Sequence, residues 1–345
     1  MYQMLISVIV PCYNRKKFLL YALESLYNQT LSKDKFEVIV VKNFEDEKID
    51  KLINYYGFKN IYSKDTTLAG KVIEGVKLAN GDIITFLEDD DLYRNNRLER
   101  VYEEFKKDND LIYLHNSQAF IDSNGNLIPE NNSLVQRIIK TQPYTDVEIN
   151  PLDCKLLEYL LLKTKNIRLN ISSTAVKKEI LINNIKHFYR LNLILDFSIF
   201  LFSLLSNKKL KHVAEKLTLY RIHEQNVSAF TSSNVSFEEY LKRRQNIIKE
   251  RYISWKYLYK NFSNKFHCSA CKKRIILEYL NYKFKYVIFS KREETKINIK
   301  IREIYIFILL NKANLNSIII PILLFIPDNI KYKALEIIYL KYKTM

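Results

Sequence analysis

The chain has 345 residues, 48% of them hydrophobic, which is enough for one large domain with a buried core and an appendage. Four scattered cysteines exclude a disulfide scaffold. No signal peptide is recognised, and no run reaches the roughly 18–20 apolar residues of a membrane span. The net charge of +17 is concentrated in residues 231–345, which hold 23 Lys and Arg against 9 Asp and Glu.

The first 120 residues alternate between strand and helix patterns. Buried strands are predicted at 6–10, 36–41 and 83–87, and helices at 18–29 and 68–79. A strand at 111–114, a hairpin at 119–128 and an irregular stretch at 129–150 follow. This order predicts an α/β fold with a mostly parallel sheet, helices on both faces, and ligands bound beyond the carboxyl ends of the strands.

The character of the sequence changes near residue 230. Beyond it, aromatic and aliphatic residues recur at helical spacing among Lys and Arg. We therefore expect a catalytic domain at 1–230 and a basic, amphipathic, mainly helical region at 231–345. Within that region His267, Cys268 and Cys271 offer three metal ligands, one fewer than structural zinc usually takes, so an incidental role is favoured.

The strongest local signal is the run Glu88-Asp89-Asp90-Asp91, which directly follows an apolar strand. Adjacent acids repel one another unless a cation compensates them, and Mg²⁺ typically binds one or two carboxylates together with phosphate oxygens. An exposed acidic turn or an acid-rich helix N-terminus explains the run equally well.

Four ordered segments within residues 5–230 resemble glycosyltransferase family 2. They are 6–15 with 22–30, then 80–91 with its D-x-D region, 195–197, and 220–228. The resemblance implies the GT-A fold, a Rossmann-like three-layer α/β/α arrangement. It also implies a nucleotide-sugar donor, an Mg²⁺ or Mn²⁺ ion, and inversion at the anomeric carbon.

The resemblance assigns roles to the acidic run. Asp90 matches the second acid of the D-x-D and would bind the metal. Glu88 matches the first acid, but it is one methylene longer, so it reaches either ribose or metal. Asp89 is expected at ribose or at metal-bound water. His223 is a second metal or diphosphate contact, or simply a hydrogen-bonded histidine.

Further donor contacts are expected around the first strand. Pro11, Tyr13 and Arg15 lie where the nucleotide base binds in this fold; Tyr13 either stacks on the base or is an ordinary packed tyrosine. Lys71 is a candidate for the diphosphate. Arg221 would hold phosphate with two parallel hydrogen bonds or pair with an acid structurally.

One departure from the family pattern concerns the base. The family usually has two acids after the second strand, whereas this chain has Lys42 and Asn43. The Asn43 side-chain oxygen still accepts a hydrogen bond, so it remains the expected base contact.

Asp196 is the expected general base. It lies where the family usually has an acidic pair, within an otherwise apolar predicted helix at 191–205. An inverting transfer needs a carboxylate that takes the proton of the acceptor hydroxyl, and burial would raise its pKa toward a useful range. A helix-capping or edge aspartate is the structural alternative.

These expectations describe an inverting glycosyltransferase with a glycan or lipid-linked acceptor. The alternatives are a sugar nucleotidyltransferase, which would lack a base such as Asp196, and a non-enzymatic binder of nucleic acid or another anionic surface. The basic tail favours attachment to anionic lipid on the cytoplasmic face of the membrane over nucleic acid, with homo-oligomer formation as another use of its apolar surface. Its expected membrane contacts are residues 318–326 and a predicted helix at 328–343, which has Ile330, Ala334, Ile337 and Ile338 on one side.

Overall fold

The computed structural model describes residues 4–13, 15–162, 167–223, 236–290, 297–311 and 315–343, except the side chains of residues 134, 315–318, 329 and 337–343. The chain divides into two compact units, Met1–Ile222 and His223–Met345. Positions Asn14, Asn226 and Ser228 of the motifs, and residue 230, lie outside the described residues.

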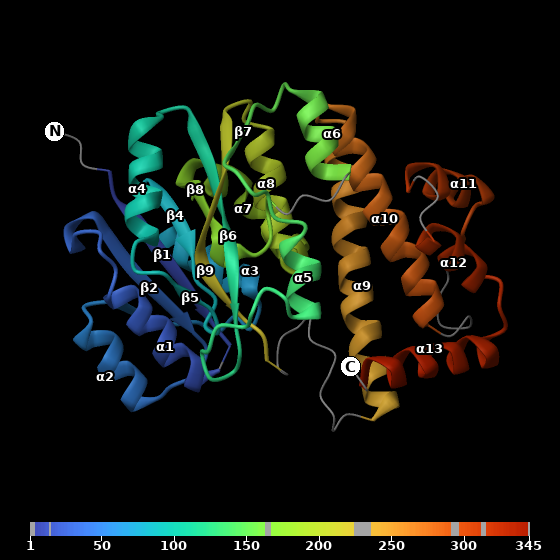
Figure 1. The fold of residues 1–345 in the computed structure, drawn as a ribbon, viewed down its shortest axis with the longest axis horizontal. Helices are drawn as coiled ribbons and strands as arrows, with labels where there is room; N and C mark the ends of the chain where they lie inside the picture. Colours follow the sequence, from blue (N-terminus) through green and yellow to red (C-terminus); the bar gives the residue numbers. More distant parts are fainter. Residues whose placement is uncertain are drawn as a thin grey trace. The chain divides into compact units, whose positions relative to one another are not determined.

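The first unit is built on one sheet in the order β3-β2-β1-β4-β8-β6-β9-β5, with β7 paired to β9 (Figure 1). The four strands from β3 to β4 are mutually parallel, whereas β8 runs antiparallel to both of its neighbours. The expected parallel sheet is therefore parallel in this half and mixed beyond it. The strands are β1 Ile6–Cys12, β2 Phe36–Lys42, β3 Lys59–Tyr62, β4 Ile83–Phe86, β5 Leu92–Tyr93, β6 Leu111–Ile121, β7 Val147–Ile149, β8 Thr174–Lys177 and β9 Lys209–Arg221.

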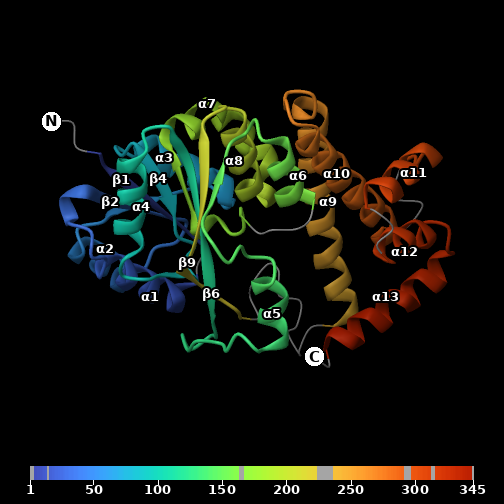
Figure 2. The ribbon, with the colours of Figure 1, turned by 45° about the horizontal axis from the view of Figure 1, so that its top comes forward.

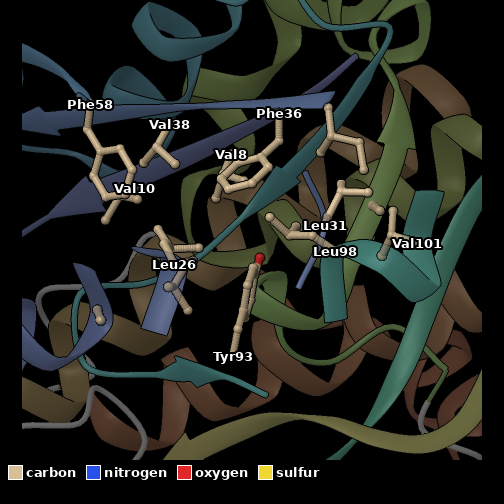
Figure 3. Packing of buried hydrophobic residues seen from close by; sticks show 14 of the residues in the cluster. Val8, Val10, Leu26, Leu31, Phe36, Val38, Phe58, Tyr93, Leu98 and Val101 are labelled. Atoms are coloured by element: carbon tan, nitrogen blue, oxygen red, sulfur yellow. The ribbon is translucent and has the colours of Figure 1, made fainter. Parts of the chain in front are cut away.

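Helices cover both faces of this sheet, as expected for the α/β class (Figure 2). Because side chains alternate along a strand, Val8 and Val10 of β1 join one core layer, while Ile9 faces Gly75 on the other side. Figure 3 shows that first layer, in which residues of α1 and α4 meet β1 and β2. The covering helices are α1 Lys16–Tyr27, α2 Glu47–Tyr55 and α4 Arg97–Lys107 on this face, and α3 Leu68–Leu78, α7 Lys178–Phe188 and α8 Leu195–Leu204 on the other.

The middle of the first unit differs from the sequence-based expectation. The predicted strand 111–114 and the first arm of the predicted hairpin are one long strand, β6. The hairpin turn itself is present: the Ile128 N–H donates to the Phe120 carbonyl at 2.8 Å, the Asp122 N–H donates to the Asn126 carbonyl at 2.9 Å, and Ile121 and Leu127 form a bridge. The reason for the long strand is tertiary, because β6 pairs along its length with β9, about a hundred residues later. The predicted irregular stretch contains α5 Ser133–Ile139 and β7, and α6 Cys154–Leu162 follows.

One segment of the first unit is long and apolar enough to span a membrane by length and composition. Lys178–Leu204 comprises 27 residues and contains an 18-residue window with a mean hydropathy of 1.2, although it has no uninterrupted apolar run of that length. It comprises α7, a short 3-10 segment at Tyr189–Ile194 and α8, most of its apolar window is buried, and Phe197 and Phe200 lie in the core, so it is accounted for as core helices.

The second unit is helical, as expected. α9 Phe237–Phe262 and α10 Ser269–Phe289 pack side by side, and α11 Ile301–Leu310, α12 Leu315–Leu323 and α13 Asp328–Lys343 follow (Figure 1). Cys268 and Cys271 are buried free thiols, and no described group of metal ligands includes them.

Candidate functional site

Three segments distant in the sequence converge at the carboxyl ends of neighbouring strands. β1 and β4 are adjacent and parallel, so Tyr13 and the acidic run leave the sheet at the same edge. β9 ends beside them, because Arg221 donates from Nε to the Asp90 carbonyl at 2.8 Å. The turn after the first strand and the acidic run thus meet at the carboxyl ends of their strands, as expected, and the structure adds Arg221 of the fourth motif to them.

Arg15 is the internal counter-ion of the acidic run. Its guanidinium binds Asp89 at 2.5 Å and also contacts Asp90, and the Tyr13 backbone N–H donates to Asp89 at 2.5 Å. Burial opposes the charge on Arg15, but the carboxylates of Asp90 and Asp89 outweigh it and raise the pKa of Arg15. Burial also raises the pKa of Asp89, against the influence of Arg15.

One arginine does not neutralise the whole run. Burial and the nearby Asp90 raise the pKa of Asp91 to about 7. Burial, followed by the charges of Asp90 and Asp91, raises the pKa of Glu88 well above its ordinary value. Burial is the larger cause of both shifts and the neighbouring carboxylates add to it, so a further cation would stabilise the ionised forms of these acids.

Asp91 ties this cluster to two other parts of the unit. Its carboxylate accepts from Asn170 Nδ2 at 2.6 Å and from the Arg221 backbone N–H at 3.0 Å. Asn170 Oδ1 in turn accepts from Ser173 Oγ at 3.1 Å. This network holds the loop before β8 and the end of β9 in place against the acidic run.

Two cationic side chains flank the acids from other directions. Lys71, in the first turns of α3, is fully buried, and its ammonium lies 4.1 Å from the centre of the Tyr13 ring. Its Nζ has no hydrogen-bond partner among the described residues, and burial lowers its pKa. Arg221 is equally buried, and the same loss of hydration lowers its pKa despite Asp91 and Asp90.

Asn43 and Lys42 have different surroundings at the end of β2. Lys42 Nζ binds Asp50 at 2.8 Å and the Phe44 carbonyl at 2.8 Å, so it has a structural role. The buried Oδ1 of Asn43 has no hydrogen-bond partner within the described residues. An unsatisfied buried acceptor is costly, which marks Asn43 as a position that a ligand donor would complete.

Pro11 is buried within β1, beyond the last residue that pairs with β4, so its missing N–H interrupts no ladder on that side. Tyr13 is half-buried, and both Arg15 and Lys71 lie over its ring. Burial, and next the charge of Glu88, raises the pKa of the Tyr13 hydroxyl.

Asp196 lies in the first turn of α8, which is otherwise apolar and buried, but its own side chain is half-buried and not enclosed. The first part of the predicted helix 191–205 belongs to a 3-10 segment, Tyr189–Ile194. Its Oδ1 accepts from the Phe197 backbone N–H at 2.7 Å. Arg168 lies in the same loop as Asn170, which donates to Asp91. The Arg168 guanidinium lies 4.7 Å from the centre of the Phe197 ring, next to Asp196 in the chain. This loop therefore links the Asp196 region to the acidic run.

The residues expected to hold a metal do not form a closed set. Across the described residues, no three His, Cys, Asp or Glu side chains are grouped as ligands of one ion. His223, the expected second ligand, is buried and is the first residue of the second unit. The excess negative charge around Asp90 nevertheless suits a cation that brings phosphate oxygens as its remaining ligands.

Sequence reasoning missed Asn170 and gave Asp91 no role of its own. Asp91 was visible as the last acid of the run. Asn170 had no signal, because it lies 79 residues from Asp91 in a segment with no motif. Only the placement of β8 beside β4 brings the two together.

Comparison with known proteins identifies this region. Residues 7–163 match the family described as Glycosyl transferase family 2. An uncharacterised glycosyltransferase of Haemophilus influenzae is 28% identical over 278 residues, covering 75% of this chain and 96% of that protein. One from Rickettsia bellii is 33% identical over 148 residues, covering 40% of this chain and 21% of that larger protein. The chain thus spans about a fifth of the Rickettsia relative.

Two further similarities are to a named glucosyltransferase and to a solved structure. A poly(ribitol-phosphate) beta-glucosyltransferase of Bacillus spizizenii is 30% identical over 115 residues, covering 31% of this chain and 18% of that protein. The crystal structure of S. aureus TarS 1–349 superposes with a TM-score of 0.52 at 19% identity, covering 99% of this chain and 90% of that one. A likeness at this identity establishes the fold, and the expected GT-A fold is confirmed.

Proposed function

We propose that the chain, whose residues 7–163 match the glycosyl transferase family 2 model, transfers a sugar from a nucleotide-sugar donor to a glycan or lipid-linked acceptor, with inversion at the anomeric carbon. The observation that carries this is the buried acidic run, incompletely neutralised, beside the unsatisfied groups of Asn43 and Lys71. A nucleoside diphosphate with a divalent cation supplies the missing charge and hydrogen bonds together.

The donor is assigned to the edge shared by β1, β2 and β4. Asn43 accepts a hydrogen bond from the base, Tyr13 stacks on it, and Lys71 and Arg221 bind the diphosphate. Uridine is the base we favour, because TarS has been crystallised with UDP and with UDP-GlcNAc. The Bacillus relative, by its name, acts on a poly(ribitol phosphate), which supports a polymer with a repeating polyol phosphate as acceptor.

Asp90 would hold an Mg²⁺ or Mn²⁺ ion, with His223 as a further contact. The ion would neutralise charge on the leaving diphosphate when bound. Arg15 shares the Asp90 carboxylate and keeps the run folded when no donor is present. Glu88 is assigned to the ribose, and Asp89 is assigned to the ribose or to water bound to the metal ion.

Asp196 is assigned as the general base. Its carboxylate takes the proton of an acceptor hydroxyl as that oxygen bonds to the anomeric carbon, while the bond from this carbon to the diphosphate oxygen breaks on the opposite face. Partial exposure suits this role, because the acceptor has to reach the carboxylate from solvent.

The assignment of Asp90 is tested by Mn²⁺ binding, read from the electron paramagnetic resonance signal of free Mn²⁺ with and without UDP. In the presence of UDP, Asp90→Asn should weaken Mn²⁺ binding by at least about tenfold. Asp110→Asn, an exposed acid of the same unit, is the matched control and should bind Mn²⁺ normally. Unchanged Mn²⁺ affinity in Asp90→Asn would remove the metal role. Release of pyrophosphate from a nucleoside triphosphate and a sugar phosphate would instead identify a nucleotidyltransferase.

A further inference from the structure

α11 and α12 of the second unit are apolar on the side that faces away from their own core. Their inner sides pack on α10, where the Phe307 and Phe284 rings lie 5.1 Å apart and Leu324 joins the same cluster. A helix with apolar residues on both sides is normally enclosed by protein or lipid. Large apolar side chains nevertheless remain exposed on α11, α12 and the residues after them: Ile301, Tyr305, Ile308, Leu309, Ile319, Ile322, Phe325 and Ile330.

These exposed residues form a pattern. On α11 they recur at i, i+4, i+7 and i+8, which places them along one stripe of the helix. On α12 and its end, Ile319, Ile322 and Phe325 recur every third residue. α11 and α12 contact each other and both pack on α10, so the two helices that carry these stripes are neighbours (Figure 2). We call these eight residues the α11–α12 face.

The exposed charges around this face are mainly positive, with Glu336 as the exposed acid of α13 among the described side chains. Lys300, Arg302 and Lys333 are exposed. Two nearby acids are already neutralised: Glu303 pairs with Lys283 at 2.7 Å, and Asp328 pairs with Lys331 at 2.6 Å. Residues 231–345 together carry a net charge of +14, with 23 basic against 9 acidic side chains. A second copy docked on this face would bring two strongly positive units together, whereas an anionic lipid surface complements both its charge and its apolar residues.

We propose that the α11–α12 face inserts into the interfacial region of a membrane leaflet that contains anionic lipid. The exposed side chains of Leu309, Ile322 and Phe325 enter the boundary between headgroups and acyl chains. Lys300, Arg302 and Lys333 contact the lipid phosphates. The proposed membrane contacts thus include α11, which the sequence patterns did not predict to bind the membrane. The side chains of Ile318, Ile337 and Ile338, which were predicted contacts, lie outside the described residues.

Co-sedimentation of the full chain with vesicles tests this proposal. The protein should pellet with vesicles of phosphatidylcholine and phosphatidylglycerol, stay in solution with phosphatidylcholine alone, and be released by high salt. Leu309→Ser should reduce binding about tenfold, from the loss of one inserted side chain. Leu127→Ser is the matched control, because Leu127 is 61% exposed and Leu309 is 62% exposed. Arg302→Glu should reduce binding at least about fivefold through charge alone.

Binding is measured without donor or acceptor, so this test is independent of the proposed transferase activity. Thermal unfolding of Leu309→Ser should match that of the unaltered chain, because the side chain is already exposed. If the chain remains in the supernatant with anionic vesicles at low salt, the proposal is wrong. It is equally wrong if light scattering shows an oligomer that Leu309→Ser dissociates while vesicle binding is unchanged, since the face would then be a contact between copies.

Discussion

The ammonium of Lys71 is buried beside Tyr13 with no hydrogen-bond partner among the described residues. An unpartnered buried charge costs stability, while the same charge gives a diphosphate a strong contact. Lys71→Met keeps the length of the side chain and removes the charge. It should raise the free energy of unfolding of the ligand-free protein by about 1 kcal/mol and weaken UDP binding by roughly 10–100-fold.

Urea unfolding and calorimetric titration with UDP and Mn²⁺ measure both effects. Lys77→Met, on the exposed side of the same helix, is the control and should change neither quantity. A Lys71→Met protein that binds UDP normally would show that Lys71 has only a structural role.

Asp196 carries the chemical step in the proposed mechanism but does not contact the donor. Asp196→Asn should leave UDP affinity unchanged and reduce turnover of the sugar donor by roughly 10²–10⁴-fold, the range typical of losing a general base. Asp153→Asn is an exposed-acid control in the same unit. Turnover within a few-fold of normal would exclude Asp196 as the base and direct attention to the other acids near the loop at Asn170.

At the scale of elements, β6 and β9 are joined by a buried pair of histidines. His115 and His212 approach Nδ1 to Nδ1 at 3.0 Å, and His115 Nε2 lies 2.7 Å from the Leu169 carbonyl. Burial lowers the pKa of both, that of His212 to about 4. The charge of His212, with those of Arg97 and Arg168, also lowers the pKa of His115. Asp146 partly opposes the shift at His212.

This pair predicts how stability depends on pH. The unfolded chain protonates these histidines near pH 6.5, whereas folded His212 does so only near pH 4, so stability is complete above pH 6.5 and falls as the pH drops toward 4. His212 contributes a slope of up to about 1.4 kcal/mol per pH unit in that window. His212→Gln should flatten the dependence, measured by urea unfolding from pH 4.5 to 7.5.

The matched control for this series is His267→Gln, at an exposed position of the second unit. Its pH dependence should follow that of the unaltered chain. An equally steep loss of stability in His212→Gln would assign the acid sensitivity to other groups.

At the scale of the whole molecule, the two compact units predict separate responses to a ligand. UDP with Mn²⁺ at about a hundred times its Kd should stabilise the first unit by roughly 2.7 kcal/mol. Amides of β1 and β4 should therefore exchange more slowly in hydrogen-exchange mass spectrometry, whereas those of α10 should not change. Equal protection of α10 would show that the units unfold together.

The sequence determined the elements whose signals are local. Runs of buried residues specify β1, β2 and β4 because each strand is covered on both faces and needs no distant partner to be recognised. The position of the acidic run directly after β4 follows from the same reasoning. The Thr67 cap and the apolar spacing of α3 likewise place Lys71 near the start of a helix.

Only the tertiary structure decided how these pieces meet. β6 is one long strand because β9 pairs with it, and no local pattern in residues 111–121 or 209–221 indicates that pairing. The bonds from Arg15 to Asp89 and from Asn170 to Asp91 join residues more than 70 positions apart, so no local pattern encodes them. Likewise, the apolar spacing of α11 identifies a helix, but which of its sides packs on α10 and which stays exposed depends on the neighbours it meets. Local propensity acts over a few residues, whereas burial and charge compensation depend on which distant segments the fold brings together.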